Sequence, residues 1–461
     1  MHWYNEMESV LNANSERTLN KPQTRLNKAS SGEAFLYWDN ISRFNSFRGN
    51  KFLLLTYFLI SMTYDFIIVG AGIVGLSAAY KLSVIHPGLK ILVLEKENRV
   101  AAHQTGNNSG VIHSGIYYKP NSYRARNCVQ GRHQLVDFCE EHNVAYDICG
   151  KVIVATDEKE LPRLDAIFET GKINGIEDIK IIDAQELAEI EPYASGLKAI
   201  HVPCAGIVDF TDVCIKLRQL IEKAGNRVML SHPVTHITHS QGTVTAMTPS
   251  GAFTAKYLIN CAGLYSDRVA ASAGVKTPVQ IVPFRGEYFE LKPKAEHMVK
   301  GLIYPMPNPE FPFLGVHFTR MALGGVECGP NAVFAFKREG YDKLSFNLEE
   351  TIETINFPGF WNLARQHWRM GMEEYYRSLS RRAFVKGLQK LIPSIQASDL
   401  IPAPSGVRAM ALQPDGNILN DFYIETTRNE IHVLNAPSPA ATAGLAIGDE
   451  IVQRAAASFG L

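Results

Sequence analysis

The chain has 461 residues, enough for two or three domains, and its 46 Lys and Arg balance its 46 Asp and Glu. Because no basic stripe stands out, nucleic acid is excluded as an expected partner. The seven cysteines contain no C-x-x-C pair, so we expect buried thiols in a reducing compartment, the cytoplasm, and no metal site.

The N-terminal segment, residues 1–61, is interpreted as a disordered or adventitious extension. Residues 1–50 lack apolar periodicity and are rich in Asn, Ser and Arg. The apolar run at 52–60 is too short to span a bilayer, which takes about 20 residues, and no small-residue cleavage site follows it. Met62 stands just before the first predicted strand, so we expect it to be the biological start. The alternative is a short anchor at 52–60 that touches a membrane.

A strand, a glycine turn, a helix and a second strand follow between Tyr64 and Glu95. The apolar run Phe66–Val69 leads into Gly70-Ala71-Gly72-Ile73-Val74-Gly75, and a second apolar run ends at Glu95. The three glycines permit a tight turn, the approach of a pyrophosphate and close packing of the helix on the sheet. The helix N-terminus offers free N–H groups to phosphates. Glu95 is placed to accept hydrogen bonds from ribose hydroxyls and would repel a 2′-phosphate, so the pattern predicts a dinucleotide other than NADP.

The loop at 104–115 combines small polar residues and glycines with apolar Val111 and Ile112. Embedded apolar residues favour a loop that packs inward, where its amides and hydroxyls lie close to an anionic or planar group. Apolar periodicity then predicts helices at 125–142, 158–173 and 209–224, and strands at 151–155, 234–238, 243–247 and 253–259. The last of these strands enters a corner at 260–263 with a second glycine, which lets another backbone segment approach the cofactor.

The second half of the chain is first rich in β-structure and then helical. Strands are predicted at 280–282, 286–291, 302–304, 313–318 and 321–326. The aromatic stretch 348–392 is predicted to be helical with a break at Pro358-Gly359, and its aromatics are interpreted as core, with a lid or membrane contact as the alternative. A small-residue turn at 435–444 then opens on a helix at 445–452, whose N-terminus could face an electron-rich cofactor edge.

Pieces of a nucleotide site thus lie at both ends and in the middle of the chain, a layout that suits an extended FAD. We predict an α/β fold in which a Rossmann-like FAD-binding domain is interleaved with a β-rich, α+β substrate domain capped by helices. The FAD-binding domain is predicted to comprise residues 62–150, 205–275 and 405–461, and the substrate domain 151–204 and 276–404.

Several segments resemble the L-2-hydroxyglutarate dehydrogenase (oxidase) family, within the superfamily of FAD-dependent D-amino-acid oxidases and glycerol-3-phosphate dehydrogenases. They read GAGIVGLSAAYKL, NNSGVIHSGIYY, NCAGLYSD, PFRGEYFEL, PEFPFLGVHFTR, GPNAVFAFKREGY and NAPSPAATAGLAIG, within 63–452. The glycine turn is common among flavoproteins, whereas PFLGVHFTR and GPNAVFAFKREGY are more specific and carry the substrate assignment. The resemblance implies oxidation of L-2-hydroxyglutarate to 2-oxoglutarate with noncovalent FAD, and electron transfer to a membrane quinone or another acceptor.

Two alternatives stay open. One is a related FAD-dependent amine or glycerol-3-phosphate oxidase or dehydrogenase, and the other is a flavin-binding protein without turnover. Since the chain offers no spanning segment, any attachment to the inner membrane is expected to be peripheral, through the aromatic helical region or the run at 52–60.

Oxidation of a 2-hydroxy acid needs a base, and histidine has a suitable pKa. The family motif supports His317 in this role, and His113 is the second candidate, with flavin contact or proton handling. A dicarboxylate also needs cations, for which arginine offers a bidentate fork. Arg408 is the first choice, followed by Arg285 and Arg320. Tyr288 and Tyr304 are candidate hydrogen-bond donors to the substrate, with packed aromatics as the alternative.

The residues predicted to contact FAD come from the glycine turn, the second strand, the inward loop, the middle corner and the C-terminal turn. They are Gly70, Gly72, Ile73, Val74, Gly75, Glu95, Lys96, Thr105, Asn108, Ser109, Val234, Ala262, Gly263, Arg408, Pro439, Ala440, Ala441 and Thr442.

Overall fold

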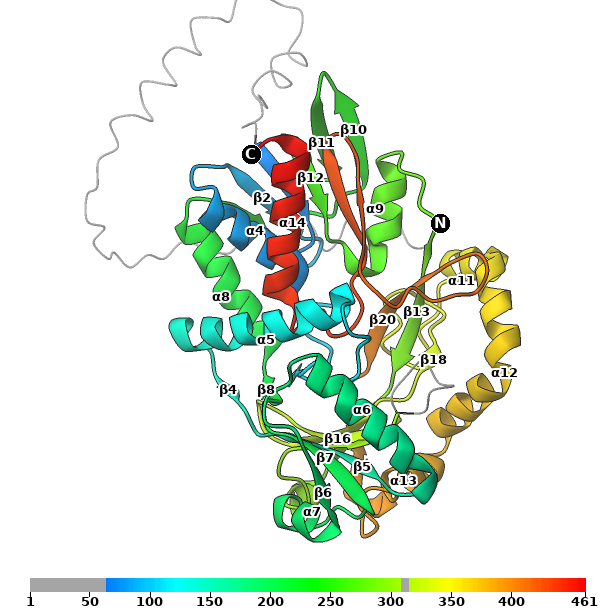
Figure 1. Cartoon of the computed structure of the whole chain (residues 1–461). Helices are drawn as coiled ribbons and strands as arrows, with labels where there is room; N and C mark the ends of the chain where they lie inside the picture. Colours follow the sequence, from blue (N-terminus) through cyan, green and yellow to red (C-terminus); the bar gives the residue numbers. More distant parts are fainter. Residues whose placement is uncertain (1–63, 308–314) are drawn as a thin grey trace, which may run out of the picture. The chain divides into compact units, whose positions relative to one another are not determined.

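Two eight-stranded sheets organise the computed structural model, which describes residues 64–307 and 315–461 (Figure 1). The first sheet runs in the order β10 (His236–Ser240), β11 (Thr243–Thr248), β12 (Gly251–Asn260), β1 (Tyr64–Val69), β2 (Ile91–Leu94), β9 (Arg227–Met229). β22 (Glu430–Asn435) joins it by pairing with β12, and β21 (Tyr423–Thr426) pairs with β22. The N-terminal segment and Met62 lie outside the described residues.

The centre of the first sheet is parallel, since β1 pairs in parallel with both β2 and β12. Parallel strands are covered on both faces, which explains why they are continuous apolar runs. Helices α4 (Ile73–Ile85) and α14 (Gly444–Phe459) lie side by side (Figure 1), and α8 (Phe210–Lys223) and α5 (Tyr123–His142) contact them. The C-terminal end of the chain thus returns to the sheet that its first described strand begins.

The second sheet has the order β19 (Leu400–Pro402), β14 (Phe289–Leu291), β17 (Val326–Gly329), β16 (His317–Arg320), β15 (Leu302–Pro305), β5 (Lys151–Ala155), β7 (Lys198–Val202), β6 (Lys180–Asp183). Successive side chains of a strand face opposite sides. Val152, Ile303 and Phe318 belong to the core on one side, together with residues of α13 (Arg381–Leu388). Ile153 and Tyr304 belong to the core on the other side, with Leu164 of α6 (Leu161–Ile173).

Two three-stranded sheets complete the scaffold around the site. One has the order β18 (Val333–Phe334), β13 (Gln280–Gly286), β20 (Gly406–Leu412), and the other β3 (Val111–Ile112), β8 (Gly206–Val208), β4 (Tyr146–Asp147). Both residues of β3 are buried, so the prediction that the loop after β2 packs inward is confirmed. The shorter helices are α7 (Ala184–Ile190), α9 (Ser266–Ser272) and α10 (Pro293–Glu296).

The aromatic helical stretch consists of α11 (Leu348–Asn356), α12 (Pro358–Leu379) and α13. The predicted break is confirmed, because α11 ends at Asn356 and Pro358 occupies the first turn of α12, where its missing N–H costs nothing. No helix of the described residues combines the length and the apolar character that crossing a bilayer needs.

Three predicted strands of the middle region differ from the structure. The run 286–291 is divided, because Gly286 ends β13 and β14 begins at Phe289 in another sheet. The run 321–326 is mainly a turn, in which Gly324 and Gly325 both have positive φ, and β17 begins only at Val326. Of the strand predicted at 313–318, residues 313 and 314 lie outside the described residues, and β16 begins at His317.

Candidate functional site

One cavity of about 1010 Å³ runs along the carboxyl ends of β1 and β2, which is the edge where open α/β sheets bind ligands. Its walls come from the first glycine turn, the inward loop, the corner after β12, β20 and the C-terminal turn. We call the part around Gly70, Gly72 and Glu95 the nucleotide end. The part around His317 and Arg408 is called the reacting end.

Two glycines of the turn at the nucleotide end, Gly70 and Gly75, leave no room for a side chain. Gly70 has φ +105°, and a Cβ there would lie 2.5 Å from the carbonyl oxygen of Cys261. A Cβ at Gly75 would overlap the carbonyl oxygen of Gly70, so Gly75 shapes the turn from behind without lining the cavity. α4 begins at Ile73 without a side-chain cap, while Ile73 N–H donates to Thr105 Oγ1 at 3.1 Å. The positive end of the helix lines the cavity, where it suits an anionic group.

Glu95 lies on the cavity wall at the end of β2, as predicted for a residue that holds a ribose. Its Oε2 accepts from Ala71 N–H at 2.7 Å and its Oε1 from Glu97 N–H at 2.9 Å. These bonds fix the carboxylate beside the glycine turn. The neighbouring Lys96 also lines the cavity, but its ammonium is paired with Glu97 and Glu339.

One group of described residues, Glu97, His103 and Glu339, brings three potential metal ligands together. The ammonium of Lys96 already lies among them, 2.5 Å from Glu97 Oε1 and 3.0 Å from His103 Nε2. A lysine therefore supplies the positive charge in this cluster. Through Glu339 the cluster also ties the segment after β18 to the end of β2.

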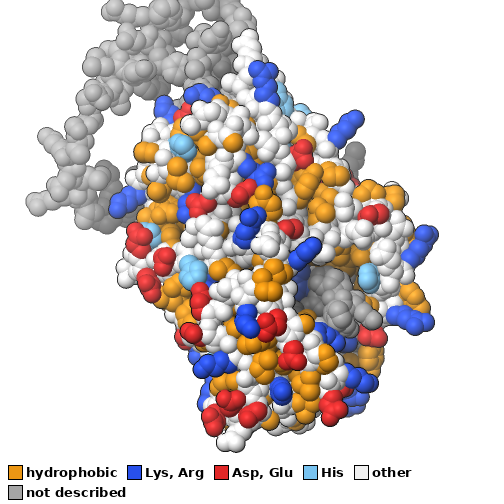
Figure 2. All heavy atoms as spheres, viewed as in Figure 1, with side chains coloured by type: hydrophobic (Ala, Val, Ile, Leu, Met, Phe, Trp, Pro, Cys, Tyr) orange, Lys and Arg blue, Asp and Glu red, His pale blue; other side chains and the backbone are white. Residues whose placement is uncertain are grey.

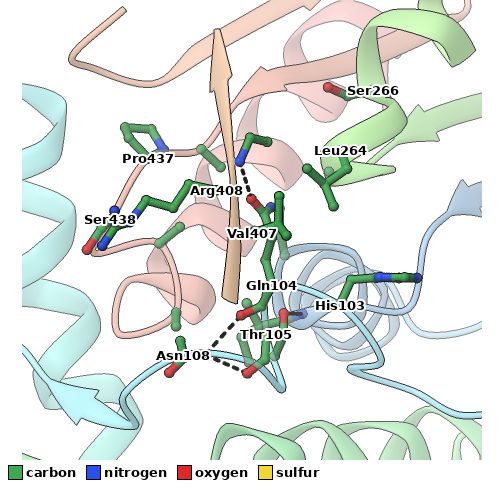
Figure 3. A pocket seen from close by; sticks show the side chains of 18 of the residues that line it. His103, Gln104, Thr105, Asn108, Leu264, Ser266, Val407, Arg408, Pro437 and Ser438 are labelled. Carbon is green, nitrogen blue, oxygen red and sulfur yellow. Dashed lines mark hydrogen bonds between the residues drawn. The ribbon is translucent and has the colours of Figure 1, made fainter. Parts of the chain in front are cut away.

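The inward loop, β20 and the C-terminal turn meet between the two ends of the cavity (Figure 3). Asn108 Nδ2 donates to the carbonyl oxygens of Gln104 and Thr105, at 3.1 and 2.6 Å, which braces the loop. Gln104 Oε1 accepts from Ala409 N–H at 2.7 Å, so the loop is bound to β20 next to Arg408. The sequence did not indicate this role of Gln104.

Most residues predicted to contact the cofactor are brought to this cavity. Those that line it are Gly70, Gly72, Ile73, Val74, Glu95, Lys96, Thr105, Asn108, Ser109, Val234, Ala262, Gly263, Arg408, Pro439, Ala440 and Ala441. Thr442 does not line it and instead joins two walls, because its Oγ1 donates to Val111 O and accepts from His113 N–H, each at 3.1 Å.

His317 is buried at the reacting end, with 5% of its surface exposed. Its Nδ1 lies 2.9 Å from the carbonyl oxygen of Gly315. A carbonyl oxygen only accepts, so Nδ1 carries the proton and Nε2 keeps its lone pair in the neutral ring. Burial lowers the pKa of His317 to about 4, although the bond to Gly315 opposes this shift. The side chain is therefore an uncharged acceptor at neutral pH, which is the state a general base requires.

His113 lies half-buried on the same cavity and follows β3 directly. Burial, and then the positive charge of the nearby Lys151, lower its pKa to about 3. Its backbone N–H, bonded to Thr442, holds it against the C-terminal turn. Both predicted histidines are thus neutral and face the reacting end.

Arg408 projects from β20 into the cavity, beside the turn of Pro437 and Ser438 (Figure 3). Arg285 and Arg320, the two other predicted carboxylate ligands, do not line this cavity. Arg285 is buried and binds Glu287 Oε1 at 2.9 Å and the carbonyl oxygen of Asp342 at 3.0 Å. Arg320 points to a separate surface hollow, where it pairs with Asp147. The reason is the alternation of β16, which places Arg320 on the face opposite to that of His317 and Thr319.

Tyr288 and Tyr304 both line the reacting end. The Tyr304 ring stacks on His317, with centroids 3.9 Å apart and planes inclined by 26°. Ser109 Oγ donates to the Tyr288 hydroxyl at 3.4 Å. Burial raises the pKa of both tyrosines, so both keep the O–H proton that a donor needs.

Three further groups at the reacting end were missed by the sequence reasoning. Lys151 is 2% exposed, and its ammonium lies over the rings of Tyr117 and Tyr304. Glu327 faces Thr319 across the β16–β17 ladder, and its pKa is raised to about 8, first by burial and then by Glu290. Arg124 lines the cavity and donates through Nε to Ser438 O at 2.6 Å. A lysine that opens a buried apolar strand was the only signal in the sequence for the first of these.

A family model described as FAD dependent oxidoreductase matches residues 65–454. The chain is 50% identical over 399 residues to an L-2-hydroxyglutarate dehydrogenase of Indibacter alkaliphilus, a match that covers 86% of this chain and 100% of that protein. It is 44% identical to the mitochondrial L-2-hydroxyglutarate dehydrogenase of Homo sapiens, with 85% and 89% covered.

Among solved structures, the fold is similar to that of L-alpha-glycerophosphate oxidase from Mycoplasma pneumoniae with FAD bound. The TM-score is 0.71 at 22% identity, and the match covers 85% of this chain and 94% of that one. Glycine oxidase from Geobacillus kaustophilus gives a TM-score of 0.64 at 16% identity, with 85% and 94% covered.

Proposed function

Because the chain belongs to the family of FAD-dependent oxidoreductases, and within it to the L-2-hydroxyglutarate dehydrogenases, we propose that it oxidises L-2-hydroxyglutarate to 2-oxoglutarate. The single observation that carries the chemistry is the neutral His317, which shares a cavity with Arg408 and the dinucleotide turn. A base, a carboxylate ligand and a cofactor site are the three parts that this reaction requires.

The residues of the nucleotide end suit FAD. The uncapped N-terminus of α4 would hold the pyrophosphate, and Glu95 would hold a ribose. The inward loop and the C-terminal turn lie where the cavity continues from that end to His317. When bound, FAD supplies the acceptor for the hydride that leaves C2 of the substrate.

In the proposed mechanism, His317 Nε2 accepts the proton of the C2 hydroxyl while the hydride departs from the same carbon. The Nδ1 proton bonded to Gly315 fixes the tautomer and the orientation of the ring. Arg408 binds one substrate carboxylate through its fork of donors. Tyr304, stacked on the imidazole, keeps the ring from rotating and shields it from water.

The substrate is tested by anaerobic reduction of the flavin in the purified holoenzyme. L-2-Hydroxyglutarate, its D-enantiomer, glycerol-3-phosphate and sarcosine are added separately, and the loss of the flavin absorbance is followed in a stopped-flow instrument. We expect fast bleaching with the L-hydroxy acid alone. Bleaching by glycerol-3-phosphate or sarcosine would favour the related oxidases, and a yellow protein that reacts with none would favour a flavin-binding protein without turnover.

We further propose that the electrons pass to a membrane quinone while the protein docks peripherally on the inner membrane through α12. Trp368, Met372, Tyr376 and Leu379, here called the α12 stripe, are 61%, 65%, 65% and 81% exposed. Their spacing of four, four and three residues places them on one face of a helix. Exposed aromatic and apolar side chains on one helix face are typical of helices that lie in a membrane interface.

The charge around the α12 stripe supports a lipid partner. Residues 358–390 contain seven Lys and Arg against two Glu. Figure 2 shows hydrophobic and basic side chains together on the edge that includes α12. Basic residues beside an apolar helix face are attracted to anionic lipid. The amphipathic face and the basic flank therefore fit a bilayer surface.

Membrane docking is tested with the double variant Trp368→Ser/Met372→Ser in sedimentation with vesicles that contain phosphatidylglycerol. Losing two interfacial side chains is expected to weaken vesicle binding at least about tenfold. Flavin reduction by substrate should be unchanged. The matched control is Ile173→Ser on α6, which is 69% exposed but lies outside the stripe. Equal binding of the double variant and the wild type would exclude this surface.

We also propose that the two large sheets correspond to two interleaved domains with the predicted boundaries. The strands of the first sheet fall within 64–94, 227–260 and 423–435, and those of the second within 151–202 and 289–402. Each set lies inside the segments predicted for FAD binding or for the substrate.

A further inference from the structure

Lys151 is a charged residue in an apolar environment. It is 2% exposed on β5, and its Nζ lies 4.8 Å from the ring centroid of Tyr117 and 4.9 Å from that of Tyr304. Within 64–307 and 315–461, no carboxylate pairs with its ammonium. Lysine is rarely buried without a partner, and the two aromatic faces compensate only part of the lost hydration. Packing alone therefore does not explain why a lysine occupies this buried position.

The sheet connects Lys151 to His317 through one aromatic ring. β5, β15 and β16 are neighbours, with Lys151 opposite Leu302 and Leu302 opposite Thr319. Because side chains alternate along strands, Lys151, Tyr304 and His317 share one face. The Tyr304 ring contacts both other groups. Its centroid lies 4.9 Å from Lys151 Nζ and 3.9 Å from the centroid of the His317 imidazole.

We propose, resting on the proposed function, that Lys151 is a positioning residue of the reacting end. It holds the rings of Tyr117 and Tyr304 in place and opposes a second positive charge on His317. The base thereby stays neutral and ready to accept a proton in mildly acidic conditions.

The groups near His317 that are charged at neutral pH, Arg408 and Lys151, are both positive, and two other titratable groups nearby are neutral. Burial lowers the pKa of His317 most, and Arg408 on β20 and Lys151 on β5 lower it further. Burial also lowers the pKa of Lys151, to about 8, so the ammonium remains charged at neutral pH. Glu327 on β17 has a pKa raised to about 8 by burial, so below that pH it adds no compensating negative charge. His113, whose pKa is lowered to about 3, is neutral as well.

A positive charge disfavours the imidazolium, so removing it makes protonation of His317 easier and raises its pKa. In the wild type, kcat/KM should stay constant as the pH falls below neutrality. It should decline only when the pH approaches the pKa of His317, about 4. In Lys151→Met, which keeps the length of the side chain without its charge, this decline should begin about 0.5 to 1 pH unit higher.

The test measures the pH dependence of anaerobic flavin reduction in the full-length holoenzyme. Lys151→Met and the polar, neutral Lys151→Gln should both move the acidic decline upward, whereas Lys151→Arg should leave it in place. Lys256→Met removes an equal charge from an exposed site on β12 and should also leave it unchanged. The proposal would be overturned if either neutral variant retained the yellow flavin and its kcat/KM declined at the same acidic pH as in the wild type.

A second readout needs no substrate. The protonation of the His317 ring is titrated by NMR in wild type and Lys151→Gln holoenzyme labelled with ¹⁵N-histidine, with His317→Gln used to assign the signal. A higher pKa in Lys151→Gln supports the proposal even if another compound proves to be the substrate. Equal titrations refute it, whereas failure of L-2-hydroxyglutarate to bleach the wild type refutes the proposed function alone.

Discussion

Replacing His317 by glutamine is expected to lower kcat about 100- to 10,000-fold while the flavin spectrum of the protein stays intact. Glutamine has a similar length and fits the buried position, but it offers no basic nitrogen. The proton of the C2 hydroxyl would then have no acceptor at the position that Nε2 occupies. KM should change little, because the charged group that binds the carboxylate, Arg408, remains in the cavity.

The measurement is single-turnover flavin reduction by L-2-hydroxyglutarate in a stopped-flow instrument, which isolates chemistry from reoxidation. His236→Gln is the matched control, since His236 is exposed on β10 and does not line the cavity. A His317→Gln variant that reduces its flavin at the wild-type rate would remove His317 from the role of base. His113→Gln should then be measured next, because it is the other neutral imidazole at the reacting end.

Replacing Arg408 by alanine is expected to raise KM for L-2-hydroxyglutarate about 100-fold, equivalent to about 2.7 kcal/mol, with a smaller change in kcat. The truncation removes a guanidinium that lines the cavity and leaves the substrate carboxylate without its fork of donors. Arg408→Lys should recover only part of the loss, because an ammonium keeps the charge but not the bidentate geometry.

Arg320→Ala is the matched control for this second experiment, because Arg320 is a surface partner of Asp147 outside the cavity. Exposed ion pairs contribute little to stability, so this variant should fold and keep its KM within about twofold. The readout is the concentration dependence of the flavin-reduction rate. An unchanged KM in Arg408→Ala together with a raised KM in Arg320→Ala would reverse the assignment.

The nucleotide end of the site could be predicted from local sequence patterns. Gly70, Gly72 and Glu95 lie within a short stretch whose geometry depends on local rules, namely backbone freedom, helix dipole and strand length. The inward loop and the turn at 435–444 were also recognisable, because small residues next to a helix or strand have a local physical meaning. The strand limits at 286–291 and 321–326 were wrong, since apolar runs do not reveal which sheet a strand joins or where a glycine turn ends it.

Which side chains meet at the reacting end depends on how distant strands pair in the folded chain. Arg285 and Arg320 matched the chemistry that a dicarboxylate needs, yet one is buried against Glu287 and the other faces solvent. Lys151 gave almost no signal, although it lies against the same ring as His317. The physical reason is that β5 and β16 are separated by well over 100 residues and become neighbours only through β15. A side chain's charge acts through space, and its neighbours in space are set by sheet pairing that no local pattern encodes.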